Sequence, residues 1–335
     1  MQAILVEVND HTYHEPSKML LKDWLDEWNN SFLNNVKPRT KESYYANCEN
    51  HIIPLIGMKK LCDLTAIDIQ RFYGGLQNLK TGKPLSAKTV KNIHGTLHKA
   101  LECAVKFGLI KSNPADCAEL PKIAKPEIKP LDEDGVRLFI AACQGHVYER
   151  VYLITLFLGL RQGEILGLSW DCVDFKHNKV IIKQQLQKQR GTGGTYTKTR
   201  TKENDVRHLV CSEYVMSQLR KQKERQDVWQ KAAGCAWDNP MNLVFTNELG
   251  CHLCAQTVYL KFKEIVKEIG YPSVRFHDLR HTFAVISICN GTDIKTLQAN
   301  LGHYSAAFTL DTYGHVTDQM KQDSAAKMDA FIAKL

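Results

Sequence analysis

The sequence contains no long apolar run, no signal-peptide pattern and no Walker motif for nucleotide phosphates. A membrane-spanning helix needs about 20 consecutive apolar residues, and no stretch of the chain approaches that length. The N-terminus has none of the features of a secretory signal. We therefore expect a cytoplasmic protein with no membrane partner. Internal repeats and low-complexity segments are absent as well.

Metal ligands are also scarce, since no cluster of carboxylates suited to a metal ion is present. The 11 cysteines are scattered along the chain, as expected of small buried hydrophobic residues in a reducing compartment. Cys251 and Cys254 have C-x-x-C spacing, but a structural zinc site needs about four ligands and no second pair appears. We expect no metal and no other cofactor. A zinc-binding interaction protein built on this pair is a distant alternative.

The bulk composition is that of an ordinary globular protein. A chain of 335 residues favours two domains, and a net charge of +8 only mildly favours a polyanionic partner. Between the expected domains, residues 121–130 contain three prolines and three lysines, a composition typical of an extended linker.

Apolar residues recur at helical spacing before this linker, so residues 17–120 are predicted to form a small all-helical domain after a short segment 1–16. The expected helices cover Ser17 to Phe32, roughly 41–52, the stretch after Thr65, and Ser86 to about 107. Ile53-Pro54 and Gly57 are expected to end the second helix. Thr65 and Asp68 resemble a capping box.

Basic residues lie near the starts of two of these helices, where main-chain N–H groups also favour phosphates. They are candidate DNA contacts, although for any single lysine a solvated surface is the simpler interpretation. The candidates are Lys37, Arg39, Lys41, Lys83, Lys88 and Lys91, with Lys198 in the second domain.

A second domain is predicted over residues 131–317. Helices are expected near 132–144, 147–160, 212–228, 255–268 and 278–290, and from the 290s into the low 300s. Val173–Phe175, Val180–Ile182 and Val206–Val210 predict a small antiparallel sheet of about three strands. Residues 318–335 read as a detached amphipathic tail helix. The expected fold is mainly α with a small antiparallel β-sheet in the second domain.

Four short motifs carry the candidate chemistry: Gly-Leu-Arg-Gln-Gly-Glu at 159–164, His-Asp-Leu-Arg at 277–280, Leu-Gly-His at 301–303 and Asp-Thr-Tyr-Gly-His at 311–315. Two arginines and two histidines can bind a phosphate, and a tyrosine can attack it. Each motif alone is weak, because a lone tyrosine is usually core and a lone histidine is often structural. Four in this order are specific.

The chain resembles the tyrosine site-specific recombinases, and the segment from Leu301 to Val316 is especially similar to integrases of temperate phages and conjugative transposons. The resemblance covers about residues 17–317. It implies a two-domain clamp on duplex DNA. It also implies strand cleavage and rejoining through a 3′-phosphotyrosyl intermediate without metal or ATP. A prophage or mobile element such as a transposon would be integrated or excised in this way.

The resemblance also implies a role for each matching residue. Tyr313 is the nucleophile, while Arg161, Arg280 and His303 bind the phosphate. His277 accepts the phenol proton or hydrogen-bonds the phosphate. Lys202 is the expected general acid for the leaving 5′-oxygen, with Lys198 as the competitor. Glu164 is expected to support Arg161; His281 and His315 are left unassigned.

Partners follow from the same resemblance. We expect double-stranded DNA at attachment sites in a bacterial cell, a homotetramer on two DNA segments, a nucleoid location, and an excisionase or a host DNA-bending protein as an accessory factor. The tail 318–335 is a plausible strap onto a neighbouring subunit. The family's separate arm-binding domain has no counterpart in the short segment 1–16, which suggests either a truncated form or a protein that works without arm sites.

Other functions stay open on the sequence. A chromosome-dimer resolvase or a relaxing topoisomerase would use similar catalytic residues. A topoisomerase rejoins only the original strand, so an assay of strand exchange between two labelled duplexes distinguishes it from a recombinase. A catalytically silent DNA-binding regulator on the same fold is the alternative from another class. One departure from the family's pattern, Ala306 and Phe308 between His303 and the tyrosine, affects packing rather than chemistry.

Overall fold

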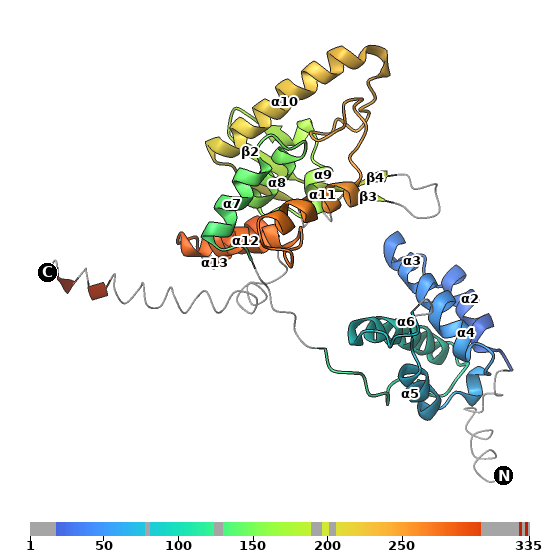
Figure 1. Ribbon diagram of the computed structural model, residues 1–335. Coiled ribbons are helices and arrows are strands. Elements are labelled where there is room, and N and C mark those ends of the chain that lie inside the picture. The colour runs from blue at the N-terminus through green and yellow to red at the C-terminus, as the bar shows by residue number, and fades with distance from the viewer. Residues whose placement is uncertain are drawn as a thin grey trace, which may run out of the picture. The chain divides into compact units, whose positions relative to one another are not determined.

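The computed structural model describes residues 18–77, 81–123, 130–188, 196–200, 206–302, 328–329 and 332–333, with main chain only for 196–200. Its internal contacts divide the chain into two compact units, residues 1–126 and 127–335 (Figure 1). The described residues are mostly helical, and the strands lie in the second unit. The predicted fold class, mainly α with a small antiparallel sheet, is therefore confirmed.

The first unit is built from helices that bury one apolar face each. They are α2 (Leu21–Ser31), α3 (Pro38–Asn47), α4 (Ile53–Ile56), α5 (Ala66–Gly74) and α6 (Ala87–Lys106). Trp24 and Trp28 of α2 are buried, as the helical spacing predicts, and the Trp24 indole donates to the carbonyl of Ala100 in α6 at 2.9 Å. The Ser86 cap and the Thr65–Asp68 capping box are both present.

The second predicted helix is wrong at its start, and of the two predicted stops Gly57 is confirmed as the C-cap while Ile53-Pro54 is not a stop. It begins at Pro38, because a proline at the first helical position loses no hydrogen bond there. It also does not end at Ile53-Pro54. A π turn over Cys48–Ile52, in which the Ile53 N–H reaches the Cys48 carbonyl, joins α3 to α4. Since Pro54 has no N–H for the carbonyl four residues earlier, a wider turn accommodates it and the chain stays helical to Ile56.

Helices of the second unit surround one large core, and a smaller separate cluster consists of Ala284, Ile288, Leu297 and Leu301. They are α7 (Glu133–Cys143), α8 (Glu149–Leu158), α9 (Gln162–Leu166), α10 (Glu213–Ala233), α11 (Ala255–Glu268), α12 (Asp278–Cys289) and α13 (Ile294–Leu301). Tyr152 of α8 lies at the centre, among the rings of Phe139, Phe262 and Phe276, and its hydroxyl donates to the Val258 carbonyl at 2.9 Å. Most residues of α8 are buried, so this helix lies inside the unit and the other elements pack around it.

Two antiparallel sheets accompany these helices. β1 (Val173–Asp174), β2 (Lys179–Ile182) and β5 (Arg207–Val210) form the predicted three-stranded sheet in the order β1-β2-β5. A second pair, β3 (Gln184–Lys188) and β4 (Tyr196–Arg200), was not predicted. Its residues are mostly polar and show no apolar alternation; β3 is held instead by close approach to α9, since a Cβ on Gly167 would lie 2.5 Å from the Leu186 nitrogen.

Several predicted segments fall outside the described residues: positions 124–129 of the linker, Lys202, and almost all of residues 303–335, including His303, Tyr313 and most of the tail. Of the tail, Met328 and Ile332 are described and are exposed. Throughout the part of the chain that is described, no helix is long and apolar enough to cross a bilayer.

Candidate active site

Arg161 is held at the start of α9 by a carboxylate two residues inside that helix. Glu164 accepts the Arg161 main-chain N–H at 2.9 Å and its Nη1 at 2.8 Å. The Glu164 side chain is only 4% exposed, whereas that of Arg161 is 42% exposed. The carboxylate thus fixes one edge of the guanidinium and leaves the remainder accessible to a ligand. This arrangement supports the predicted role of Glu164.

The pKa of Glu164 shows which forces dominate around it. Burial raises the pKa, but the positive charges of Arg207 and Arg161 and the hydrogen bonds from Arg161 outweigh burial, so that the pKa lies below its usual value. Glu164 is therefore a carboxylate at neutral pH and keeps its grip on Arg161.

Arg280 is positioned by main-chain carbonyls of two other helix ends. It lies on α12 and is 1% exposed. Its Nη1 donates to the Gly159 carbonyl at 2.8 Å, and its Nη2 donates to the Leu301 carbonyl. Residue 159 must be glycine for this arrangement: its φ is +62°, and a Cβ would lie 2.4 Å from the Phe283 ring.

The C-terminal end of α13 gathers three guanidiniums. Arg280 and Arg207 both donate to the Leu301 carbonyl, and Arg161 Nη2 lies 3.4 Å from the Gly302 carbonyl. A helix C-terminus carries partial negative charge on its free carbonyls, which favours cations there. The last described turn of α13 therefore brings Arg161 and Arg280 together, and it leads directly into His303 in the sequence.

His277 precedes α12 and is surrounded by positive charge. Although its surface is partly open to solvent, neighbouring protein atoms lower its pKa, and Arg280 and Arg161 lower it further. Its ring packs edge-on against His281 at a centroid distance of 5.0 Å. The pKa of His281 falls to about 4, first through burial and then through His277. A neutral His277 at physiological pH can accept a proton or a hydrogen bond.

The turn that carries His277 is held by an ion pair between the buried Asp278 carboxylate and the exposed Arg275 guanidinium. Asp278 accepts two hydrogen bonds from the Arg275 guanidinium, at 2.7 and 3.0 Å, and one from the Arg275 main-chain N–H. One turn along α12, the Thr282 hydroxyl accepts the main-chain N–H of Leu131 at 3.0 Å. The ion pair stiffens the turn itself, and the hydrogen bond ties the start of α12 to the beginning of the second unit.

The structure thus brings Arg161, Glu164, His277 and Arg280 into one neighbourhood, while Lys202, His303 and Tyr313 lie outside the described residues. Lys198 is in β4, where its main chain pairs with Leu186; its side chain is not described. Among the described residues, which include Cys251 and Cys254, no three His, Cys, Asp or Glu side chains come together as metal ligands.

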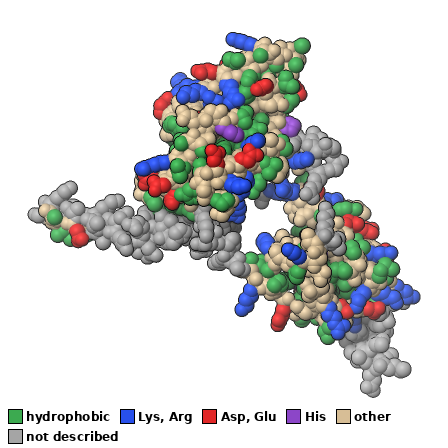
Figure 2. All heavy atoms as spheres, in the orientation of Figure 1, with side chains coloured by type: hydrophobic (Ala, Val, Ile, Leu, Met, Phe, Trp, Pro, Cys, Tyr) green, Lys and Arg blue, Asp and Glu red, His purple; other side chains and the backbone are tan. Residues whose placement is uncertain are grey.

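Five of the six candidate DNA contacts of the first unit lie at helix starts, and Lys83 lies outside a helix, four residues before α6 begins. Lys37 precedes α3, Arg39 and Lys41 fall in its first turn, and Lys88 and Lys91 fall at the start of α6. All are exposed except Lys41, which is half-buried. On the face drawn in Figure 2, basic side chains are spread over each unit among acidic ones and do not form one patch. What these five candidate residues share is therefore their position at the start of a helix, and not membership of one continuous basic patch.

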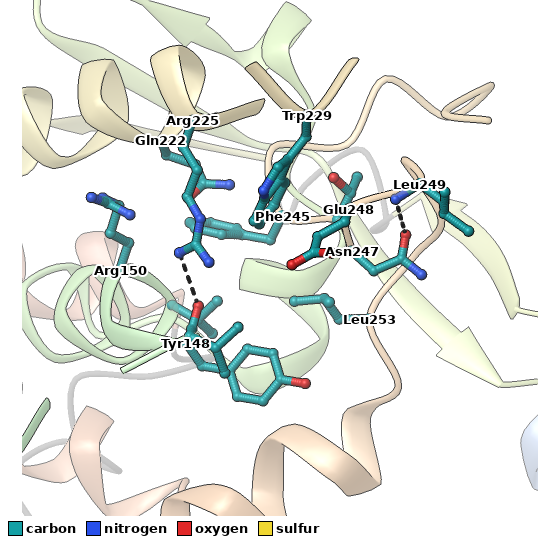
Figure 3. A pocket seen from close by; sticks show the side chains of 13 residues that line it. Tyr148, Arg150, Gln222, Arg225, Trp229, Phe245, Asn247, Glu248, Leu249 and Leu253 are labelled. Atoms are coloured by element: carbon teal, nitrogen blue, oxygen red, sulfur yellow. Dashed lines mark hydrogen bonds between the residues drawn. The ribbon is translucent and has the colours of Figure 1, made fainter. Parts of the chain in front are cut away.

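A separate pocket of about 320 Å³ lies near the N-terminal end of α8, away from these residues (Figure 3). Arg225 enters it from α10, stacks on Trp229 and donates to the Val147 carbonyl at 3.3 Å. Arg150 also lines it. None of the predicted catalytic residues that the structure describes contributes to this pocket.

Sequence reasoning assigned no role to Arg207. This arginine opens β5 and is 7% exposed, with its Nη2 2.7 Å from Glu164 Oε2. The predicted strand held a signal that could have found it, because residues 207 and 209 share one face of a strand. The structure buries both of these residues. An arginine on the apolar face of a strand needs a buried partner.

Comparison with known proteins covers nearly the whole chain. The phage integrase family matches residues 129–320, and the SAM-like N-terminal domain of phage integrases matches residues 20–77. A tyrosine recombinase XerC-like protein of Caldanaerobacter subterraneus is 28% identical, over 88% of this chain and 79% of its own length. The ICEBs1 integrase of Bacillus subtilis is 25% identical, over 87% of this chain and 78% of its own length.

Solved structures share the fold. The integrase of transposon Tn1549, in complex with transposon right end DNA, has a TM-score of 0.77 at 21% identity, covering 93% of this chain and 100% of that one. A lambda integrase dimer bound to a core site has a TM-score of 0.61 at 18% identity, covering 93% of this chain and 86% of that one.

Proposed function

Because this chain belongs to the phage integrase family, we propose that it is a site-specific DNA recombinase, an integrase that cuts and rejoins DNA through a covalent phosphotyrosyl intermediate. The observation that carries the proposal is the convergence of Arg161 and Arg280 on the C-terminal end of α13. Two guanidiniums at one helix end, next to an imidazole kept neutral, form a site for a phosphodiester whose negative charge increases during attack.

In the proposed mechanism, the Tyr313 oxygen attacks the scissile phosphorus and the 5′-oxygen leaves. A tyrosine has a pKa of about 10 in water, so the phenol must give up its proton during attack. His277 is suited to accept that proton or to hydrogen-bond the phosphate, because the surrounding protein atoms and the two arginines hold its pKa below the usual value. Arg161, Arg280 and His303 bind the non-bridging oxygens.

The leaving 5′-oxygen needs a proton, which we assign to Lys202, with Lys198 as the competing donor. The bond broken in the DNA is replaced by a 3′-phosphotyrosyl bond of similar energy. A 5′-hydroxyl from a partner strand then attacks that bond and releases Tyr313. The number of phosphodiester-type bonds is the same before and after, so the exchange needs no ATP.

The substrate in this proposal is double-stranded DNA at attachment sites of a mobile element or prophage, in the bacterial nucleoid. We propose that the helical domain, residues 17–120, and the catalytic domain, residues 131–317, clamp the duplex. The helix-start cations Lys37, Arg39 and Lys88 would neutralise phosphates. A lambda integrase tetramer has been solved on a Holliday junction, and we propose a tetramer here too, with accessory DNA-bending or excision factors directing the outcome.

The test is a covalent-adduct assay. The protein is mixed with nicked duplexes from the DNA that flanks its gene, and denaturing gels are examined for protein that migrates with labelled DNA. An adduct that is lost in Tyr313→Phe, while DNA binding persists, supports both the reaction and the nucleophile. Clear binding to a duplex without any adduct would contradict the enzyme and favour a silent DNA-binding regulator.

A further inference from the structure

Arg207 occupies a central place behind the catalytic arginines. Its Nη2 pairs at 2.7 Å with Glu164 Oε2, the oxygen that also accepts the Arg161 main-chain N–H, while the Arg161 guanidinium takes Oε1. Its Nη1 donates to the Leu301 carbonyl. The guanidinium also packs so closely on the next residue that a Cβ on Gly302 would lie 2.6 Å from Nη1. Gly302 has φ +63°, a conformation in which glycine is favoured.

These contacts connect the parts of the site to one another. Glu164 is almost completely buried and touches two guanidiniums, Arg161 and Arg207. The Leu301 carbonyl also touches two, Arg207 and Arg280. Arg207 is the member common to both groups, so it joins the carboxylate that holds Arg161 to the carbonyl that holds Arg280.

We propose that Arg207 is a positioning residue for strand cleavage, which sets the spacing between Arg161, Arg280 and the segment that enters His303. The inference rests on the proposed function. Without Arg207, the buried Glu164 carboxylate has Arg161 as its remaining described partner and draws that guanidinium inward, away from the phosphate. The Leu301–Gly302 turn loses the side chain packed against it at the same time.

The position of Arg207 in the chain extends this role. It directly opens β5 and follows Lys202 by five residues in the sequence. In sequence, Arg207 therefore lies close to the residue that we propose as the general acid. No contact of Arg207 with DNA is part of the proposal, and its burial at 7% exposure argues against one.

The test compares single-turnover cleavage of a nicked duplex by the wild-type protein, Arg207→Met, Arg207→Lys and Arg220→Met. Arg220→Met is the matched control, because Arg220 pairs with Glu213 on the surface of α10 and belongs to none of the groups above. Outer-shell residues that orient metal ligands typically contribute roughly 10- to 100-fold to affinity or activity. By analogy we expect a loss of the same order for Arg207→Met at saturating DNA, with DNA affinity within about threefold. Arg207→Lys should be intermediate, since an ammonium keeps the charge but cannot span both acceptors.

A second substrate separates positioning from general damage to the fold. In a duplex with a methylphosphonate at the scissile position, one non-bridging oxygen is replaced by a methyl group, so less negative charge must be neutralised. If Arg207 acts by aiming Arg161, the deficit of Arg207→Met should shrink on this substrate. An equal deficit on both substrates, or cleavage of the normal duplex within about threefold of wild type, would overturn the proposal.

Each remaining outcome is also informative. If Arg207→Met does not fold, the same comparison of two substrates is made with Arg207→Lys, for which a deficit confined to the normal duplex supports the proposal and an equal deficit opposes it. If the wild-type protein binds duplex but forms no adduct with either substrate, the proposed function fails, and this result is distinct from failure of the Arg207 inference.

Discussion

Glu164 Oε1 lies 2.8 Å from Arg161 Nη1, and the pair joins an almost fully buried carboxylate to a guanidinium that is 42% exposed. The buried partner is the fixed one. Arg161 can therefore face a ligand without choosing among rotamers at each binding event, which lowers the entropic cost of binding.

Replacing Glu164 by glutamine should slow cleavage more than it weakens DNA binding. Glutamine keeps the shape but offers no negative charge between Arg161 and Arg207, so the two guanidiniums repel each other and Arg161 loses its fixed orientation. We expect roughly a 10- to 100-fold slower adduct formation, measured in single turnover at saturating DNA. A variant that cleaves at the wild-type rate would show that the carboxylate does not orient Arg161.

Gly159→Ala should destabilise the second unit and displace Arg280. The new Cβ would lie 2.4 Å from the Phe283 ring and 2.9 Å from the Leu301 side chain, at a φ of +62°. Strain in the left-handed region and overpacking together predict a loss of about 3 kcal/mol in the free energy of unfolding. The measurement is chemical denaturation.

Gly145→Ala is the matched control for that experiment. Gly145 also has a positive φ, +75°, but nothing lies within 4 Å of an added Cβ. The left-handed strain alone predicts a loss of about 1 kcal/mol. Equal losses for the two variants would mean that contact with Phe283 and Leu301 is not what requires glycine at position 159.

The folded state should lose stability as the pH falls from 6.5 towards 4. The pKa of His281 is about 4 in the folded protein and 6.5 when unperturbed. In this interval the unfolded chain binds more protons than the folded one, so acidification favours unfolding; above the interval His281 has no effect. Melting temperatures between about pH 7.5 and 5 measure this dependence. His281→Asn should flatten it and leave the smaller contribution of His277, and an unchanged slope would contradict the assignment.

Lys88→Gln and Lys91→Gln should weaken DNA binding in a salt-dependent way. Each lost phosphate contact lowers the slope of log affinity against log salt by about 0.9. The control is Lys106→Gln, because Lys106 lies at the opposite end of α6 and pairs with Glu102. Equal salt slopes for all three variants would remove the start of α6 from the proposed DNA interface.

Local signals in the sequence predicted local structure well. Thr65 and Asp68 are three residues apart and form the expected capping box, and Ser86 caps α6 as its position suggests. The π turn before Pro54 was missed because a proline in a helical pattern normally ends the helix, and the rare alternative depends on packing across the whole domain.

In the candidate site, too, residues close in sequence were predicted, and those that depend on distant contacts were missed. Arg161 with Glu164, and His277 with Arg280, are close in sequence and were identified as pairs. Arg207 was not assigned, because one of its partners, Leu301, lies 94 residues further along the chain. The β3–β4 hairpin was missed for a related reason: its position depends on Gly163 and Gly167 of another element, whose lack of side chains admits β3.

The carbonyl oxygens at the end of α13 have a consequence for selectivity. Arg280 and Arg207 share the Leu301 oxygen, and Arg161 approaches that of Gly302. The protein's own main chain thus competes with any incoming anion for these donors. A small ion such as sulfate or free phosphate must displace those bonds with little other binding energy to compensate. Under the proposed function, a long duplex supplies many additional contacts, so we expect the protein to discriminate in favour of a polymer over small anions.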